Sequence, residues 1–533
     1  MTKIKEIKYY WHKFFIDKND KEFIRHNKRY FTTNSQKKES IVLMELNESC
    51  SNLISYSYLA SVLAKKYDST IYSYFPRIPR SFFKRFLWEF RRIFGFKTIT
   101  IFKSFGAEGI IIPSLNNSMK GEVEEVFMRK INSIKTKDDL ENLTISGILF
   151  GDLIYDYYLT YYKETEIDLF SEKFKQHFRA CIKSIVFWKS FIKSNNVKAI
   201  NVSHTVYSNA IPIRIAIEYG VSSFQTTAND IYRLSKERKF AYTEFNDFRK
   251  VFATLPELIQ KEGIGKAKER VESRFSGKIG VDMSYSKKSA FGDELGYRLI
   301  KKSSNIKILV APHCFFDSPH PFGNNLFPDV LEWLKELVEI SNKTNYDWYV
   351  KTHPDFIQET KIVVDNFFQD LPQFTILPSN APHNQIIDEG INFALTMYGT
   401  IAFEYAAKNI PVINASLNNP HIAYDFNINP QSREEYRDIL MNLINIEHSI
   451  NVNDVYEYYF MKNLYSSESW LFDDYDEMLD YVGGYYGQFT SLIFKFWLER
   501  WGNQKHNKIL LNLETFIDSE EYQFDTNNLY KAN

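Results

Sequence analysis

The order of apolar runs and amphipathic stretches along the chain predicts consecutive series of parallel β-strands and helices. Ile41–Leu46 has the length and composition of a buried strand, the apolar residues of Asn52–Lys66 have helical spacing, and Ser69–Tyr74 is predicted as a second strand. Strand, helix and strand in this order form a βαβ unit, which belongs to a parallel, doubly wound sheet.

The same order returns later in the chain. Val197–Val202 is predicted as a strand, and it is followed by a helix over residues 210–219 and a strand over 221–225. A second series begins with the apolar run Ile306–Ala311. Its further elements are predicted as helices over 329–342 and 401–408 and strands over 347–350, 374–377, 391–395 and 410–414.

These two series divide the chain into an N-terminal α/β domain over residues 1–257 and a C-terminal α/β domain over 304–445. Residues 258–303 are polar and rich in Lys, Ser and Gly, which favours a linker between the domains. Residues 446–533 are predicted as a helical tail that packs back on the N-terminal domain. The expected fold class is α/β, with two Rossmann-like domains.

The composition is that of an ordinary globular protein. The 533 residues include 66 Lys and Arg and 66 Asp and Glu, so the formal net charge is zero, whereas a general nucleic-acid binder carries a basic excess. Nucleic acid is therefore not an expected partner. Cys50, Cys181 and Cys314 lie far apart, which argues against a disulfide framework or a thiolate zinc site.

The chain has no apolar run of the roughly 18 residues that mark a spanning helix, and its first residues carry charges where a signal peptide has its apolar core. We expect a cytoplasmic protein, either soluble or peripheral at the cytoplasmic face of the inner membrane.

Candidate binding residues follow the strands of the second series, because ligands of doubly wound sheets bind at the carboxyl ends of strands. Lys351-Thr-His-Pro354 directly follows the strand over 347–350. At this edge Lys351 would supply charge to a phosphate and His353 a directed hydrogen bond or a proton, while Pro354 fixes the backbone. The alternative is a loop in which the histidine only caps neighbouring backbone.

The segment Thr396-Met-Tyr-Gly-Thr400 opens the helix over 401–408. Gly399 lets the backbone approach a ligand closely, and free N–H groups together with the Thr400 hydroxyl would form an anion site. Glu404, one turn later, is placed to accept hydrogen bonds from a pair of ribose or sugar hydroxyls. An ordinary N-cap with an outward glutamate is the alternative.

The loop Ala311–His320 opens the second series with His313 and Asp317, which are expected to reach a cleft between the domains. The sequence contains neither G-x-x-x-x-G-K-[ST] nor G-x-G-x-x-G after a strand, so ATPase and dinucleotide-binding activities are not expected. No metal site is predicted.

The first series contributes candidate carboxylates. Asp152 and Asp156 are four residues apart and share one face if residues 151–158 are helical. A carboxylate facing the cleft would act as a base or nucleophile on a sugar acceptor. Glu45 ends the first strand, and His204 follows the strand over 197–202. For each of these four, a solvated face, an N-cap or a salt bridge is the structural alternative.

Three segments together resemble the donor half of GT-B glycosyltransferases: Lys351-Thr-His-Pro354, Tyr398-Gly-Thr400 with Glu404, and Asn409-Ile-Pro411. More narrowly, the pattern is similar to the capsule and surface-polysaccharide group that includes β-Kdo transferases and "surface carbohydrate biosynthesis" proteins. Signatures similar to those of that group also occur elsewhere, at Gly151–Asp156, Ser203-His204 with Tyr207, and His313 with Asp317–His320.

The resemblance implies a GT-B fold, with two Rossmann-like domains facing a cleft and a C-terminal helical tail. It implies a nucleotide-sugar donor in the C-terminal half, an acceptor in the N-terminal half and no metal cofactor. The donor residues that it implies are Lys351, His353, Pro354, Tyr398, Gly399, Thr400, Glu404, His313 and Asp317. On the acceptor side Asp156 is favoured ahead of Asp152 and Glu45, with His204 nearby; the Q-x-D-type acceptor motif of the Kdo transferases is not found, which leaves the nucleophile open.

The expected function is transfer of a sugar, with Kdo or a related acid sugar from a CMP donor favoured, onto a glycan or lipid-linked glycan of capsule polysaccharide or lipopolysaccharide. Two alternatives remain. One is a UDP-sugar transferase or UDP-sugar 2-epimerase on the same scaffold. The other is a non-catalytic glycan-binding or lipid-binding protein coupled to export.

Residues Arg77–Lys103 form a basic and aromatic insertion near residues 75–106, with eight Lys and Arg against the single acid Glu89. Between Phe82 and Phe94 the aromatic residues recur near helical spacing, which is typical of an interfacial helix on anionic lipid. A helix of the N-terminal domain with one buried face is the alternative.

Overall fold

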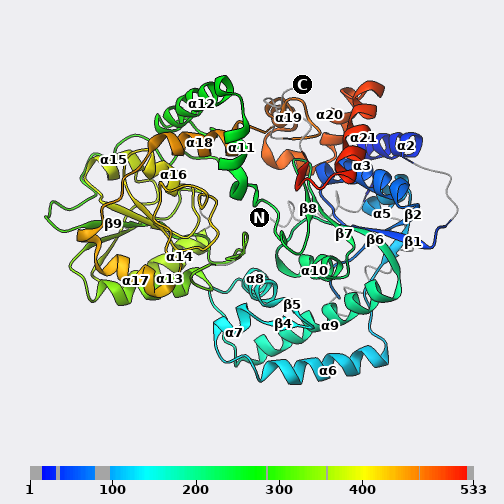
Figure 1. Ribbon diagram of the computed structural model, residues 1–533, viewed down its shortest axis with the longest axis horizontal. Coiled ribbons are helices and arrows are strands. Elements are labelled where there is room, and N and C mark those ends of the chain that lie inside the picture. Colours follow the sequence, from blue (N-terminus) through cyan, green and yellow to red (C-terminus); the bar gives the residue numbers. More distant parts are fainter. Residues whose placement is uncertain are drawn as a thin grey trace. The chain divides into compact units, whose positions relative to one another are not determined.

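The computed structural model describes residues 15–31, 37–78, 96–283, 286–323, 325–355, 358–466 and 469–524. The chain forms two compact units, whose helices and strands are labelled in Figure 1. The first unit comprises Met1–Tyr157, Asp168–Ala241 and Ser467–Asn527, and the second comprises Tyr158–Ile167, Tyr242–Ser466 and Asn528–Asn533.

The first unit is built on a seven-stranded sheet with the order β14-β8-β7-β6-β1-β2-β3. Its strands are β1 (Ser40–Glu45), β2 (Ser69–Tyr74), β3 (Ala107–Ile111), β6 (Asn196–Val202), β7 (Ser222–Thr226), β8 (Ile231–Leu234) and β14 (Gln523–Phe524). The five strands from β3 to β7 in this order are parallel, whereas β8 pairs antiparallel with β7 and β14 pairs antiparallel with β8. The strand order reverses direction between β1 and β6, which is where doubly wound sheets bind ligands.

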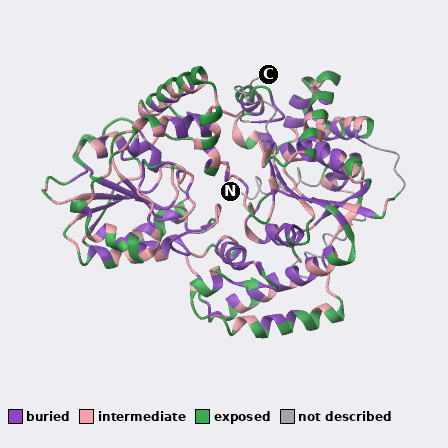
Figure 2. Cartoon of the chain, in the orientation of Figure 1, coloured by how far each residue is buried: buried purple, intermediate pink, exposed green. Residues whose placement is uncertain are grey.

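Helices pack on this sheet through one apolar face, since their apolar residues recur at helical spacing. The helices of the first unit are α2 (Lys18–Tyr30), α3 (Cys50–Lys66), α5 (Lys97–Ser104), α6 (Asn117–Ile131), α7 (Lys137–Glu141), α8 (Gly151–Tyr162), α9 (Glu172–Ser194), α10 (Ile211–Glu218), α19 (Tyr475–Val482), α20 (Leu492–Glu499) and α21 (Asn503–Asp518), with the 3-10 turns η1 (Tyr207–Ala210) and η4 (Tyr485–Phe489); α8 ends within the second unit. A two-stranded hairpin, β4 (Thr144–Ile145) and β5 (Ile148–Leu149), precedes α8. Figure 2 shows the buried residues concentrated on the strands and on the inner faces of these helices.

The segment over residues 469–524 belongs to the core of the first unit. Phe23 of α2 stacks on Phe494 of α20 with ring centroids 4.1 Å apart, and Trp470 and Trp497 are buried in the same cluster. Phe524 joins this core from β14, which pairs with β8.

The second unit is built on a five-stranded sheet with the order β11-β10-β9-β12-β13, all parallel. Its strands are β9 (Lys307–Val310), β10 (Asp347–Val350), β11 (Phe374–Ile376), β12 (Phe393–Thr396) and β13 (Val412–Asn414). The order reverses between β9 and β12, so the carboxyl ends of β9, β10 and β12 form the expected ligand-binding edge.

The second unit has its own helices and core. The helices are α11 (Phe248–Thr254), α12 (Glu257–Phe275), α13 (Val330–Ser341), α14 (Gln358–Phe368), α15 (His383–Asp388), α16 (Ile401–Ala406), α17 (Arg433–Met441) and α18 (Val452–Asn463), with the 3-10 turns η2 (Glu244–Asp247) and η3 (Leu443–Asn445). Trp333 of α13 is fully buried, and its indole N–H donates to the Tyr436 hydroxyl of α17 over 2.8 Å. The helices α11, α12 and α18 enclose a separate aromatic cluster.

The predicted α/β fold class is confirmed, because the chain contains two doubly wound α/β units and a helical segment over 469–524 that returns to the first of them. Three predicted boundaries differ. The first unit's central stretch ends at Ala241 instead of at residue 257, and residues 257–275 form the regular helix α12, where a linker was expected from residue 258. The helix α18 packs in the second unit instead of on the first. Whether the two units face a cleft stays a prediction.

Most of the basic aromatic insertion lies outside the described residues, so its predicted membrane contact stays a prediction. No helix in the described part of the chain is both long enough and apolar enough to cross a membrane.

Candidate functional site

In the second unit, the loops after β9 and β12 meet through His313. The Tyr398 backbone N–H donates to His313 Nε2 over 3.3 Å, and the Thr396 hydroxyl lies 3.1 Å from the same nitrogen. The rings of His313 and Tyr398 are in contact, with centroids 4.2 Å apart and planes tilted by 34°. Burial lowers the pKa of His313 to about 4, so the ring is neutral at pH 7 and suited to accept these hydrogen bonds.

Gly399 is needed at its position because these two loops meet so closely. A Cβ atom on Gly399 would lie 2.8 Å from Thr396 Oγ1 and 3.3 Å from Cε1 of the His313 ring. The Gly399 N–H donates to the same Thr396 hydroxyl over 3.2 Å. The predicted close approach at Gly399 is therefore made to the protein's own residues.

Lys351 lies at the carboxyl end of β10 and is 2 % exposed. Its ammonium has a 3.4 Å contact with the Thr352 carbonyl oxygen. Burial lowers the pKa of Lys351 to about 8, while the nearby carboxylate of Glu404 acts in the opposite direction. A buried ammonium of this kind is a strong electrostatic partner for an anion that enters the site.

Glu404 is paired with an arginine that the sequence patterns did not single out. Arg274, in the last turn of α12, donates to Glu404 Oε1 from Nε over 2.7 Å and approaches the same oxygen with Nη2 at 2.5 Å. The Glu404 side chain is buried, and that of Arg274 is 12 % exposed. Arg274 and Lys351 thus share the negative charge of a single carboxylate.

His353 lies directly beside this pair of cations. Its Nδ1 accepts the Asp355 backbone N–H over 3.1 Å, which leaves the proton of the neutral ring on Nε2. Burial and the charge of Lys351 lower the pKa of His353. His353 is therefore a neutral N–H donor at this edge of the sheet.

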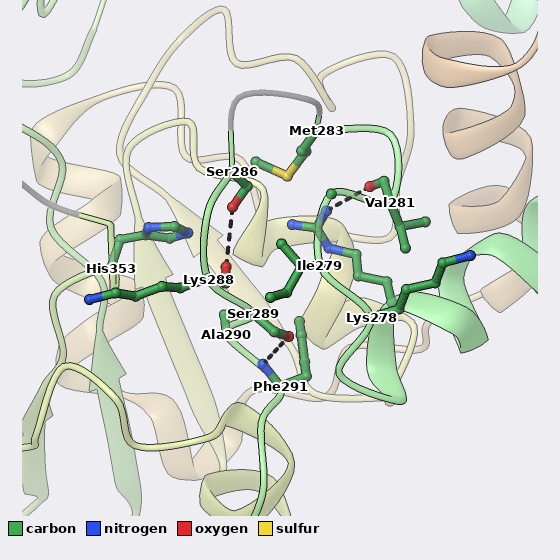
Figure 3. Close-up of a pocket in the computed structure, with 12 residues that line it drawn as sticks. Lys278, Ile279, Val281, Met283, Ser286, Lys288, Ser289, Ala290, Phe291 and His353 are labelled. Carbon is green, nitrogen blue, oxygen red and sulfur yellow. Dashed lines mark hydrogen bonds between the residues drawn. The ribbon is translucent and has the colours of Figure 1, made fainter. Parts of the chain in front are cut away.

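A small recess with a cavity volume of about 20 Å³ opens to solvent beside His353 (Figure 3). One wall is the site loop, which we define as residues 277–283 and 286–291. Arg274, Lys288 and His353 give the recess a basic side, while Ile279 and Phe291 belong to its apolar lining.

The remaining predicted donor residues lie around this edge in varied surroundings. Asp317 is exposed and accepts the Ser318 N–H over 2.8 Å, whereas the Tyr398 hydroxyl donates to the Ser318 carbonyl over 3.1 Å. Pro354 accepts a hydrogen bond from Lys288. Thr400 is exposed and its side chain does not cap α16, a helix of only six residues.

In the first unit, Glu45 joins the loops at the point where the strand order reverses. Glu45 ends β1 and is 3 % exposed, and its carboxylate accepts the Ser203 N–H over 2.5 Å and the Asn209 amide over 2.6 Å. Burial raises the pKa of Glu45, although these donors and the charge of Arg77 oppose the shift. Tyr207, between the two donors in sequence, has a backbone φ of 58°, a conformation that non-glycine residues rarely adopt.

The other acceptor-side candidates are arranged differently. Asp152 and Asp156 lie on α8, as the spacing predicted, and both are buried. Asp152 Oδ2 pairs with Arg214 Nη2 at 2.6 Å, and Arg214 also donates to the Leu149 carbonyl over 3.1 Å, so this carboxylate holds α8 to α10. His204 is exposed in the loop after β6.

Arg274, Lys288 and Asn209 were missed by the sequence patterns. Arg274 and Lys288 lie within residues 258–303, which were predicted as a linker, although Gly263, Ala267 and Val271 recur at the spacing of a helix with one buried face. Among the described residues, no group of three or more His, Cys, Asp or Glu side chains is arranged to hold a metal ion.

Comparison with known proteins gives distant structural matches only. No family model matches the chain, and no curated protein matches it. Sixty-five chains of solved structures match. A UDP-GlcNAc 2-epimerase from Neisseria meningitidis is 9% identical with a TM-score of 0.21, covering 79% of this chain and 98% of its own. A glycosyltransferase from Rickettsia africae is 10% identical with a TM-score of 0.24, covering 90% and 100%. MurG from Acinetobacter baumannii is 10% identical with a TM-score of 0.23, covering 79% and 95%.

At this level of similarity the α/β assignment rests on the chain's own strand order and register, and the activities of the three proteins do not transfer to it.

Proposed function

We propose that the chain is a glycosyltransferase whose second unit binds the phosphate of a nucleotide-sugar donor at Lys351 and His353. The observation that carries this proposal is the pair of buried cations, Lys351 and Arg274, that share the one carboxylate of Glu404 at the carboxyl end of a doubly wound sheet.

The charges of this cluster favour an anionic ligand. A buried ammonium is costly unless an anion compensates it, and Glu404 is already bound to Arg274 through Oε1. A phosphate bound beside Lys351 would compensate the positive charge of the ammonium and raise its pKa. The neutral His353 would donate its Nε2–H to a phosphate oxygen without adding a further charge.

The acceptor is proposed to bind at the carboxyl end of the first sheet, near Glu45. In the reaction, an acceptor hydroxyl forms a bond to the anomeric carbon of the donor, and the bond from that carbon to the phosphate oxygen breaks. The nucleotide leaves with that electron pair, and a carboxylate takes the hydroxyl proton. The structure favours Glu45 for this role over Asp152, because the Asp152 carboxylate is paired with Arg214. It gives no further support to Asp156.

The sequence resemblance makes the finer proposal that the donor is CMP-Kdo or a related CMP-linked acid sugar, and that the acceptor is a capsule or lipopolysaccharide glycan. A CMP donor therefore heads the ligands to test, followed by UDP-linked sugars.

The test is ligand-induced stabilisation followed by a transfer assay. Thermal unfolding would be measured with CMP, CDP, UDP, GDP and CMP-Kdo in the presence of EDTA, because a ligand that binds only the folded state raises the melting temperature. Lys351→Met should abolish the shift, whereas Lys302→Met, at an exposed lysine before β9, should preserve it.

Three results would overturn the proposal in different ways. Absence of a shift with every nucleotide would leave the non-catalytic binding protein as the better alternative. Conversion of a UDP-sugar without acceptor would identify an epimerase. A shift that Lys351→Met leaves unchanged would move the ligand away from the proposed site.

A further inference from the structure

We propose that Lys288 and the recess beside His353 form a second anion subsite, which recognises a negative charge of the donor other than the phosphate held at Lys351. The second charge is either a second phosphate of a nucleoside diphosphate sugar or the carboxylate of an acid sugar. This inference rests on the proposed function of the same site.

The site loop that carries Lys288 is held in place by charged anchors. Asp355 Oδ2 accepts the Ser286 hydroxyl over 2.9 Å and the backbone N–H groups of Lys287 and Lys288 over 3.0 and 3.3 Å. Burial by itself would raise the pKa of Asp355, but these donors lower it, so the carboxylate is ionised and bound to the loop backbone.

The opposite end of the loop is anchored from α12. Asp282 pairs with Arg270 at 2.5 Å and accepts the Tyr459 hydroxyl over 2.5 Å, and Arg274 donates to the Val281 carbonyl over 3.3 Å. Gly277 has a φ of 85°, and a Cβ there would lie 2.8 Å from the Phe291 carbonyl oxygen. The backbones at the two ends of the site loop are therefore in close contact. The loop wall of the recess is therefore formed without a ligand.

Lys288 is the cation that this geometry leaves without an acidic partner. Its backbone N–H is bound to Asp355, while its ammonium contacts the neutral Pro354 carbonyl at 3.5 Å, and among the described residues it forms no ion pair. Figure 3 shows its side chain running alongside His353, whereas Lys278, which also lines the recess, extends its side chain away from His353.

The positions of Lys351, His353 and Lys288 along this edge determine how many anionic groups a ligand needs in order to use the whole site. Lys351 is buried, His353 lies at the opening of the recess as a neutral donor, and Lys288 is exposed at its mouth. A ligand with one negative charge satisfies the buried ammonium and leaves Lys288 unused. A ligand with two separate negative groups uses both lysines, with His353 between them.

The experiment compares ligands that carry one anionic group with ligands that carry two, and these are called one-charge and two-charge ligands below. Dissociation constants would be measured by calorimetry, in EDTA, for the matched monophosphates and diphosphates of cytidine, uridine and guanosine and for CMP-Kdo. The wild-type protein is expected to bind a two-charge ligand at least about tenfold more tightly than its one-charge counterpart. A gain with a diphosphate assigns the second phosphate to the subsite, and a gain with CMP-Kdo alone assigns the sugar carboxylate.

Two variants of the site loop complete the test. Lys288→Gln should reduce the gain to less than about threefold and leave monophosphate binding unchanged, while Lys278→Gln should behave as wild type. Equal binding of one-charge and two-charge ligands, or equal effects of the two variants, would overturn the subsite. If nucleotides bind through Lys351 but Lys288→Gln has no effect, only this inference fails; if no nucleotide binds at all, the proposed function fails with it.

Discussion

Arg274 and Glu404 form a buried ion pair in which two nitrogen atoms of the guanidinium, Nε at 2.7 Å and Nη2 at 2.5 Å, approach one carboxylate oxygen, Oε1. The pair joins the last turn of α12 to α16, which follows the ligand-binding edge of the second sheet. It fixes the one carboxylate whose charge acts on Lys351.

Breaking this pair should destabilise the second unit. Glu404→Gln leaves the guanidinium of Arg274 buried without its counter-charge, which typically costs about 3–5 kcal/mol of unfolding free energy. The combined Arg274→Met and Glu404→Gln variant should lose less than the sum of the two single variants. Urea unfolding of the wild type, the two single variants and the double variant measures this coupling, and simple additivity would show that the two groups do not interact.

Lys351 should make both ligand affinity and stability depend on pH. Its pKa of about 8 in the folded protein is below the ordinary 10.5, so between these values the unfolded chain holds a proton that the folded chain has lost. Its contribution to the free energy of unfolding therefore rises with pH across that window. Anion affinity should fall above pH 8 as the ammonium is lost, by up to roughly tenfold at pH 9. Lys351→Met should flatten both profiles.

His353 should be required for turnover and dispensable for folding. His353→Ala removes the Nε2–H donor, and we expect transfer to fall at least about 100-fold. The melting temperature should change little, because the ring is partly exposed and its hydrogen bond is to the adjacent Asp355 backbone. Full activity in the alanine variant would remove His353 from the mechanism.

Gly399→Ala should disturb the loops after β9 and β12. The added methyl group would lie 2.8 Å from Thr396 Oγ1 and press on the His313 ring, so the variant should lose about 1–3 kcal/mol of stability and bind nucleotide weakly. Gly292→Ala is the matched control, because a Cβ there meets nothing within 4 Å. Similar unfolding curves for both variants would contradict the proposed contact.

Glu45 and Asp152 should respond differently to loss of their charges. Asp152→Asn leaves Arg214 buried without its partner and should cost about 3–5 kcal/mol of stability. Glu45→Gln keeps one acceptor oxygen for the Ser203 N–H, and the Asn209 amide can turn to accept from the new NH2 group, so the variant should retain most of the stability and lose transfer activity if Glu45 takes the acceptor proton. Comparison of melting temperatures with rates separates the two roles.

Most strands of the two sheets could be predicted from sequence because they are short runs that end at recognisable loops, whereas β3, β8 and β14 were not predicted. Lys351, His353 and Glu404 could be placed near one another for the same reason, since carboxyl ends of parallel strands share one edge. The helix α12 was not predicted, because its buried face consists of Gly263, Ala267 and Val271. The first two of these residues are small and give little hydrophobic signal.

Long-range charge pairing was also beyond the sequence patterns. Arg274 is separated from Glu404 by 130 positions, and Asp152 from Arg214 by 62. Neither pair has a local motif. The sequence therefore could not show that Asp152 holds α8 to α10, whereas Glu45 lies at the edge of the first sheet.

The return of residues 469–524 to the first unit determines when that unit is able to fold during synthesis. Trp470, Phe494 and Phe524 supply part of the core around α2 and α3, and β14 covers the edge strand β8. A ribosome must therefore make the whole second unit before the first can close, and until then the nascent first unit exposes apolar surface and an unpaired strand edge. Most of the second unit lies in the single stretch Tyr242–Ser466. We therefore expect the second unit to complete its core before the first.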